Sequence, residues 1–393
     1  MANKKIKKTS PFKPGSKLRV KKSYYTFSRQ YPAGNIHIKN MRSRSRRSPR
    51  ARLALAVLGF VLLVAISYFV TSFALNISYK EPSASSQSTQ LEKPFIKTDG
   101  VRALYMPYNK LGDEKYIKSF ISRIRRKNAN SVVIDFKTQQ GKLAYTSLHE
   151  YAIMGKCALY DNDTVRKAID LFSEYDINII AGIYCFEDSA VAEAVKSISV
   201  KYMDTKVNWL DTDGGGWLNP CSKRSQNYII KVMLELNEMG IKGFILNSAH
   251  FPDATNTSGA SYPGLAVYKS HNDALLYFIK QAKSKLPKDC FLLLNQDSNT
   301  TLSPKNSLYY GSMAKSDVDG FSIDTLKRPE DYVIDKKTDF ASMLSLFANL
   351  QNQCEKKSFV PIINMEEYTG SYLRHIKKAG YENFILYDEN GDY

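Results

Sequence analysis

Gly243–Pro252 reads Gly-Phe-Ile-Leu-Asn-Ser-Ala-His-Phe-Pro, a short apolar run that ends abruptly in polar residues. It follows the helix-like segment 225–240, and an apolar run this short indicates a buried parallel strand rather than a helix. The side chains of Asn247, Ser248 and His250 come just past its end. In α/β barrels the catalytic residues lie at such strand ends. An ordinary polar turn after a core strand would give the same sequence pattern.

The chain after residue 98 alternates strand-like and helix-like segments. Strands are expected over 101–105, 131–136, 177–184, 243–246, 290–294, 318–323, 359–363 and 383–387, and helices over 113–127, 164–175, 225–240, 271–285, 339–353 and 369–379. Such alternation predicts parallel strands with crossover helices, and eight strands in about 290 residues match a (β/α)8 TIM barrel. An open doubly wound sheet is the alternative, but no Gly-rich phosphate loop follows the first strand.

The lengths of the loops indicate which face of the predicted barrel carries the functional site. Helix-to-strand connections are short, whereas the segments after strands are long: 137–163, 185–224, 250–270 and 295–317. Long loops inside a compact domain are usually functional, so we expect the site at the carboxyl ends of the strands.

The basic charge of the chain is concentrated at its start. Of the 56 Lys and Arg residues, 17 lie in residues 1–52, which leaves 39 against 38 Asp and Glu, so the rest of the chain is near neutral. Residues 1–52 are expected to form a disordered cytoplasmic tail that could meet anionic lipid, and we expect no nucleic-acid surface on the folded part.

An uncharged run follows the tail. Residues 53–75 would span about 35 Å as a helix, enough to cross a membrane. Because the basic flank lies on the amino-terminal side, we expect a single-pass signal anchor in the cell membrane, with a cytoplasmic amino terminus and an extracytoplasmic domain over 98–393. Residues 76–97 are Ser-rich and predict a flexible stalk. A cleaved signal peptide is the competing interpretation.

Polar residues follow nearly every predicted strand, with aromatic residues in the same loops. The candidate site residues are Asp135, Lys137, Tyr145, Glu187, Asp188, Trp217, Asn247, His250, Asn295, Asp297, Asp324, Glu366 and Asp388. Carboxylates beside aromatic rings suit a carbohydrate, and a glycosidase needs two carboxyl groups in different protonation states. The four histidines after the tail lack metal-ligand spacing, so neither a metal nor another cofactor is expected.

Several stretches resemble a family of bacterial proteins described as putative glycosyl hydrolases, whose TIM barrel is distantly similar to the α-amylase barrels. The matching stretches are 100–105, 133–137 with 141–145, 183–188, 217–220, 243–252, and 384–388 with Tyr393. Together they cover the chain from about residue 98 onward, and they imply a barrel that acts on cell-wall or extracellular polysaccharide.

The departures from the family pattern bear on activity. Where the family strand has Asp, this chain has Asn247, and Asn295 stands at a position that in the family tends to be Asp. An amide binds a sugar hydroxyl but cannot act as a nucleophile or proton shuttle.

Two hypotheses follow. In the first, Asp135, Asp297 and Glu366 supply the acid, base or nucleophile, with Trp217 and Tyr145 as sugar platforms. In the second, the barrel binds glycan or a partner without cleavage.

Overall fold

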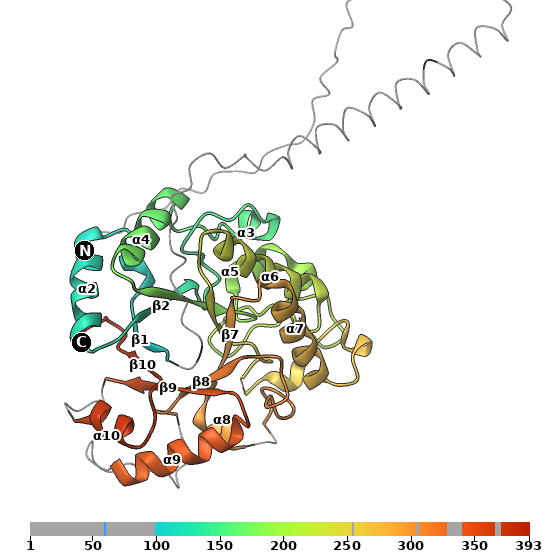
Figure 1. Ribbon diagram of the computed structural model, residues 1–393. Helices are drawn as coiled ribbons and strands as arrows, with labels where there is room; N and C mark the ends of the chain where they lie inside the picture. Colours follow the sequence, from blue (N-terminus) through green and yellow to red (C-terminus); the bar gives the residue numbers. More distant parts are fainter. Residues whose placement is uncertain are drawn as a thin grey trace, which may run out of the picture. The chain divides into compact units, whose positions relative to one another are not determined.

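The computed structural model describes residues 59, 98, 100–253, 255–303, 306–327, 340–365 and 371–393. These residues contain a closed barrel of parallel strands in the order β1-β10-β9-β8-β7-β5-β3-β2, with helices on its outside (Figure 1). The (β/α)8 barrel predicted from the alternation is therefore confirmed.

The barrel strands are β1 (Arg102–Tyr105), β2 (Ser131–Lys137), β3 (Asn178–Tyr184), β5 (Gly243–Asn247), β7 (Phe291–Asp297), β8 (Gly320–Asp324), β9 (Ser358–Asn364) and β10 (Phe384–Tyr387). The longer helices are α2 (Glu114–Arg126), α4 (Asn162–Glu174), α6 (Lys223–Glu238), α7 (His271–Lys285), α9 (Phe340–Gln353) and α10 (Tyr372–Lys378). Each predicted strand and helix has an observed counterpart whose ends differ by only a few residues.

The long loops contain short elements that the sequence pattern did not predict. They are helices α3 (Glu150–Met154), α5 (Ser189–Ala194) and α8 (Ser298–Leu302), an antiparallel pair β4 (Lys201–Tyr202) and β6 (Ala260–Ser261), and 3-10 turns at 108–110, 196–198, 257–259 and 265–267. None is long enough to show the period of its own structure in the sequence.

Side-chain caps set where several helices begin. Asp113, Asp161, Ser222 and Ser270 each accept a hydrogen bond from the backbone N–H three residues later, at the starts of α2, α4, α6 and α7. Such a cap pairs a helix N–H group that has no partner within the helix. It explains why α6 begins two residues before the apolar pattern that predicted it.

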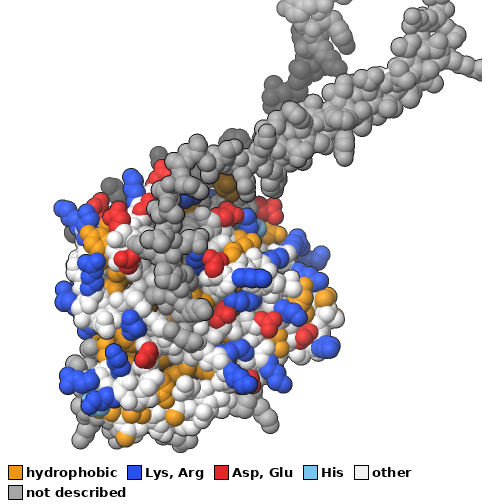
Figure 2. All heavy atoms as spheres, in the orientation of Figure 1, with side chains coloured by type: hydrophobic (Ala, Val, Ile, Leu, Met, Phe, Trp, Pro, Cys, Tyr) orange, Lys and Arg blue, Asp and Glu red, His pale blue; other side chains and the backbone are white. Residues whose placement is uncertain are grey.

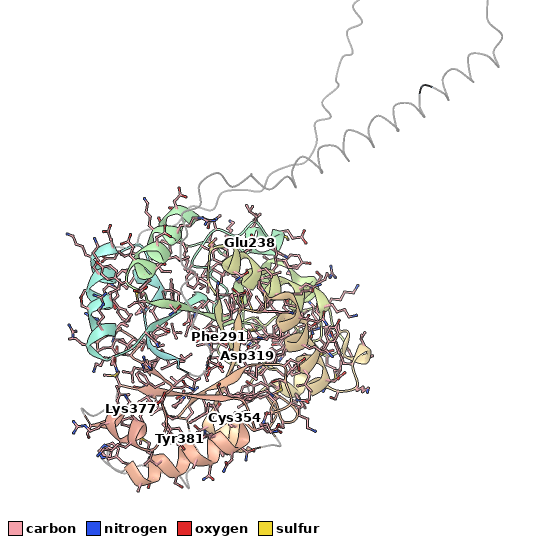
Figure 3. All side chains as sticks on the ribbon, viewed as in Figure 1. Glu238, Phe291, Asp319, Cys354, Lys377 and Tyr381 are labelled. Atoms are coloured by element: carbon pink, nitrogen blue, oxygen red, sulfur yellow. The ribbon has the colours of Figure 1, made fainter. Side chains whose placement is uncertain are left out.

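Alternate residues of each strand face the barrel interior. The inner core contains Ala103, Val133, Ile180, Ile245, Leu293, Val360 and Ile385, and a larger core lies outside the strands and under the helices. Near the amino ends of the strands, Phe291 occupies the interior because Gly243 leaves it room: a Cβ at residue 243 would come within 2.7 Å of the Phe291 ring (Figure 3). Nearer the carboxyl ends of the strands, the inward-facing residues are polar.

The barrel closes where its first strand meets its last. Ala103 of β1 is in register with Ile385 of β10, and Gly100 N donates a 2.7 Å hydrogen bond to Asn383 Oδ1. Tyr393 crosses this seam, since its hydroxyl donates to the Tyr105 carbonyl oxygen at 2.7 Å. The carboxyl-terminal segment therefore holds β1 in place.

The described residues include no helix that is long and apolar enough to cross a membrane. The predicted span 53–75 lies outside the described residues except for Gly59, and so do the predicted tail 1–52 and nearly all of the predicted stalk 76–97. Residues 90–393 form one compact unit that holds every barrel strand.

Candidate active site

Four inward-facing side chains form a hydrogen-bonded chain at the carboxyl ends of β1, β2, β5 and β7. The Tyr105 hydroxyl donates to Asp135 Oδ2 at 3.0 Å, and Asn247 Nδ2 donates to Asp135 Oδ1 at 3.3 Å. Asn295 Nδ2 in turn donates to Asn247 Oδ1 at 2.8 Å. The structure thus brings together three predicted residues, Asp135, Asn247 and Asn295, and adds Tyr105.

A glycine makes this arrangement possible. β3 lies between β2 and β5, and its Gly182 is in register with Asp135 on one side and with Ile245 on the other. A Cβ at residue 182 would lie 2.0 Å from Asp135 Oδ1 and 3.3 Å from Asn247 Nδ2. The missing side chain leaves the space in which the aspartate and the asparagine meet.

Gly182→Ala should therefore disturb the site more than an ordinary strand substitution. We expect it to lower the free energy of unfolding by about 1–3 kcal/mol, the usual cost of overpacking, because the Asp135 carboxyl must move. Urea unfolding measures this cost. Gly240→Ala is a contrasting variant, because nothing lies within 4 Å of its Cβ position and its cost comes only from a backbone φ of +100°. A Gly182→Ala protein that is as stable as the wild type would contradict the proposed close contact.

Burial tunes the acidity of Asp135. Its side chain is 8 % exposed, and burial raises the pKa of its carboxyl to about 6, against the opposing effect of the Tyr105 hydrogen bond. A carboxyl group whose pKa lies near the working pH can both give and take a proton. Asp135 is therefore suited to acid–base chemistry at the carboxyl ends of the barrel strands.

A second carboxyl group, Glu187, follows the neighbouring strand. Ser248 Oγ donates to Glu187 Oε2 at 2.8 Å, and Gln139 Nε2 donates to its other oxygen. Asp135 and Glu187 thus contact consecutive residues at the end of β5, Asn247 and Ser248. Ser248 has a left-handed φ of +44°, an uncommon conformation for a residue other than glycine, and such conformations concentrate at functional sites.

The charges of both carboxyl groups act on the hydroxyl of Tyr184. The pKa of its hydroxyl is raised by burial, then by the charges of Asp135, Tyr387 and Glu187. The phenol is therefore within electrostatic reach of both Asp135 and Glu187. Tyr105 and Tyr387 pack with ring centroids 4.8 Å apart, so tyrosines surround much of Asp135.

His250 follows the end of β5. Its Nδ1 lies 2.7 Å from the Phe251 carbonyl oxygen, which can only accept, so Nδ1 carries a proton and Nε2 is an acceptor in the neutral ring. Burial lowers the pKa of His250, which favours that neutral ring. Its ring centroid lies 5.7 Å from Trp217 and 5.6 Å from Tyr309.

Three of the predicted carboxylates accept hydrogen bonds from backbone N–H groups that follow them closely in the chain. Asp297 Oδ1 accepts from Thr300 N at 2.6 Å and caps α8. Asp324, in register with Asp297, accepts from Leu326 N, and Asp388 accepts from the backbone of residues 390 and 392. Glu366 lies outside the described residues.

Three of the predicted substrate-binding residues are buried and paired within the protein. Lys137 and Asp188 have no exposed side-chain surface and pair with each other, with Lys137 Nζ 2.8 Å from Asp188 Oδ2. Tyr145 is also fully buried, and its hydroxyl donates to Glu235 Oε2 at 2.7 Å. These side chains contribute to the packing outside the strands, so their predicted contact with a ligand stays a prediction.

Trp217 contributes little more surface than these three. It is 4 % exposed, and its Nε1 donates to Asp211 Oδ2 at 3.0 Å. Its predicted role as a flat sugar platform stays a prediction, and it would need more of the ring to be exposed. Among the described residues, no group of three or more His, Cys, Asp or Glu side chains could hold a metal ion.

One family model matches part of the chain. Residues 103–294 match the model of a family described as "Putative glycosyl hydrolase domain". The match confirms the family resemblance seen in the sequence over those residues, which include Asp135, Glu187 and Asn247. No curated protein matches the chain.

Solved structures with similar folds include three bacterial proteins. A hypothetical protein from Ruminiclostridium thermocellum ATCC 27405 shares 22 % identity over 49 % of this chain and 96 % of its own, with a TM-score of 0.44. Amy13B from Eubacterium rectale shares 16 % identity over 79 % and 70 %, with a TM-score of 0.44. The glycoside hydrolase domain of a PelA variant from Pseudomonas aeruginosa shares 12 % identity over 75 % and 96 %, with a TM-score of 0.41.

Proposed function

We propose, on the premise of that domain match, that this chain is a membrane-anchored, extracytoplasmic glycoside hydrolase that acts on cell-wall or extracellular polysaccharide. The observation that carries the proposal is Asp135, an acid–base carboxyl group with a pKa of about 6 at the carboxyl end of the barrel. Burial gives it the raised pKa that the proton donor of a glycosidase needs, because the carboxyl group then keeps its proton near neutral pH.

Asp135 would protonate the oxygen of the leaving sugar. In its proton-carrying form it can donate to that oxygen, while Tyr105 and Asn247 hold the carboxyl in place. Glycoside hydrolysis also needs a second carboxyl group, as nucleophile or as the base that activates water. We assign that role to Glu187, because it and Asp135 contact adjacent residues of the same strand end. Asn247 then serves to position the acid.

A catalytically inactive, glycan-binding barrel is the second candidate. Asn247 and Asn295 are hydrogen-bonded to each other where the family strand pattern has carboxylates. Neither amide can transfer a proton or attack a sugar carbon. The same polar mouth would then recognise sugar hydroxyls without cleaving the bond.

Turnover of a panel of cell-wall and secreted polysaccharides by the purified full-length chain separates the two candidates. We expect reducing ends to appear for at least one polymer, and Glu187→Gln to abolish more than 99 % of that turnover, since a catalytic carboxyl contributes about 10²-fold or more. Asp213→Asn, an exposed carboxyl in the loop after β3, serves as the matched control and should be fully active. Binding without turnover would establish the inactive barrel.

The membrane anchor is tested by fractionation. We expect the full chain to sediment with membranes and to resist extraction by salt, because residues 53–75 would have to leave the hydrocarbon core. Deleting residues 1–75 should release the protein into the soluble fraction. Protease added outside intact cells should degrade the domain from 98 to 393, and protection of that domain would contradict the proposed orientation.

A further inference from the structure

A cavity of about 220 Å³ lies at the end of the barrel opposite the candidate active site. It is lined by Arg102, Lys127, Asn128, Leu373, Arg374, Ile376, Lys377, Tyr381, Glu382 and Phe384. Arg102 and Phe384 are the first residues of β1 and β10, and Lys127 follows α2, so the cavity opens at the amino ends of the strands. Figure 3 labels Lys377, which belongs to α10, and Tyr381, which follows that helix.

The lining of this cavity combines positive charge with an apolar floor. Four side chains are cationic and one, Glu382, is acidic. Ile376 and Phe384 are buried beneath them, and Leu373 is partly exposed. Figure 2 shows a group of Lys and Arg side chains at its lower left, in the region of α10. A site of this kind fits an anion that carries an apolar portion.

Helix dipoles account for only part of this charge. Lys127 and Lys377 lie at the carboxyl ends of α2 and α10, where a cation stabilises a helix. Arg374 lies in the first turn of α10, where a cation opposes the dipole, and Arg102 is on a strand. Among the described residues, no ion pair involves Arg374 or Lys377.

A neighbouring cavity of about 170 Å³ continues the basic surface. It shares Tyr381 and Glu382 with the first cavity and adds Lys356 and Lys357. Two adjoining hollows therefore carry six cationic side chains and one carboxylate between them.

We propose that this surface, formed by the two cavities around Tyr381, binds the phosphate headgroups of an anionic phospholipid membrane. The cations would meet the phosphates, and the floor of Leu373, Ile376 and Phe384 would meet the glycerol and the first acyl carbons. A membrane is favoured over a soluble phosphate compound because Arg102 lines the cavity, and the chain that enters the barrel at Arg102 carries the predicted span 53–75. The proposal rests on the proposed membrane anchor, but it does not depend on glycosidase activity.

Vesicle co-sedimentation of residues 90–393 tests this proposal without the anchor or the basic tail. That unit holds the whole closed sheet and its core. We expect it to bind vesicles that contain phosphatidylglycerol, not to bind vesicles of phosphatidylcholine alone, and to lose binding as salt is raised well above about 0.1 M. Equal binding to both vesicle types, or to neither, would overturn the proposal.

Two matched double variants distinguish this surface from a generally basic end of the barrel. Each basic residue near an anionic membrane strengthens binding about fivefold, so Arg374→Gln/Lys377→Gln should weaken it about thirtyfold. Lys285→Gln/Lys288→Gln removes the same charge at the carboxyl end of α7, on the same end of the barrel but outside both cavities. Equal losses in the two variants would overturn the assigned surface. All four side chains lie at or near the surface, and unchanged thermal unfolding would confirm that both variants are folded.

Discussion

Replacing Asp135 with Asn is expected to reduce turnover of the polysaccharide substrate by about 10²- to 10⁴-fold, the contribution of a positioned general acid. The substitution keeps the size of the side chain, so it changes the chemistry without opening a cavity. In the wild type, activity that needs the protonated carboxyl should fall as the pH rises through about 6, the pKa of Asp135. The pH profile of kcat/KM, measured beside the variant, checks both statements.

The same substitution should stabilise the fold at neutral pH. Burial raises the folded-state pKa of Asp135 from 3.8 to about 6, so its stabilising contribution is complete below about pH 4 and is lost as the pH rises through 6. Ionised Asp135 therefore costs up to about 3 kcal/mol at pH 8, and an amide avoids this cost. We expect Asp135→Asn to exceed the wild type in free energy of unfolding at pH 8, with the difference vanishing toward pH 4.

Urea unfolding at the two pH values measures that difference. Asp213→Asn is again the control, because an exposed carboxyl should show neither effect. A loss of activity together with a loss of stability at pH 8 would mean that Asp135 is needed for folding, and the assignment of a general acid would fail. A gain in stability with a loss of activity is the expected signature of a site strained for its function.

Lys137→Met is expected to lower the free energy of unfolding by about 3–5 kcal/mol. The change leaves the carboxylate of Asp188 buried without its cation, and it removes the donor that holds the Tyr184 carbonyl oxygen at 2.7 Å. Lys137→Met/Asp188→Asn should recover part of the loss, because the uncompensated charge is gone. Chemical denaturation of the three proteins measures the coupling between the two residues.

An exposed ion pair provides the control for this experiment. Lys242 Nζ lies 2.7 Å from Asp289 Oδ2, with the two side chains 38 % and 54 % exposed. Lys242→Met should therefore cost no more than about 1 kcal/mol. If Lys137→Met instead kept full stability and weakened glycan binding, Lys137 would be a ligand contact, as its position in the sequence first indicated.

The sequence predicted the barrel well because the barrel depends on repeated patterns. Each strand is a short apolar run between turn residues, and each long helix has an apolar face, so both could be recognised one at a time. The elements inside the long loops could not be recognised in this way. The five-residue helix α8, for example, begins at a cap on Asp297, and only the structure shows that this predicted catalytic residue forms the cap.

The site was predictable where strands alternate regularly and unpredictable where they do not. Asp135, Asn247 and Asn295 each occupy an inward position at a strand end, and they meet as expected. Lys137 is two residues after Asp135 and should share its face. The register between β2 and β3 shifts between these two residues, so Lys137 is paired with Ile183 and turns outward. The contribution of Gly182 depends on a neighbouring strand, which a single sequence does not display.

The seam between β1 and β10 also bears on how the protein is made. Gly100 and Asn383, hydrogen-bonded across that seam, are 283 residues apart in the chain. A ribosome therefore delivers the first strand long before its partner exists, and the barrel can close only after β10 has been synthesised. Contacts between such distant residues form slowly. Tyr105, whose hydroxyl donates to Asp135, also accepts a hydrogen bond from Tyr393 at its carbonyl oxygen, so the surroundings of the acid are complete only after the barrel has closed.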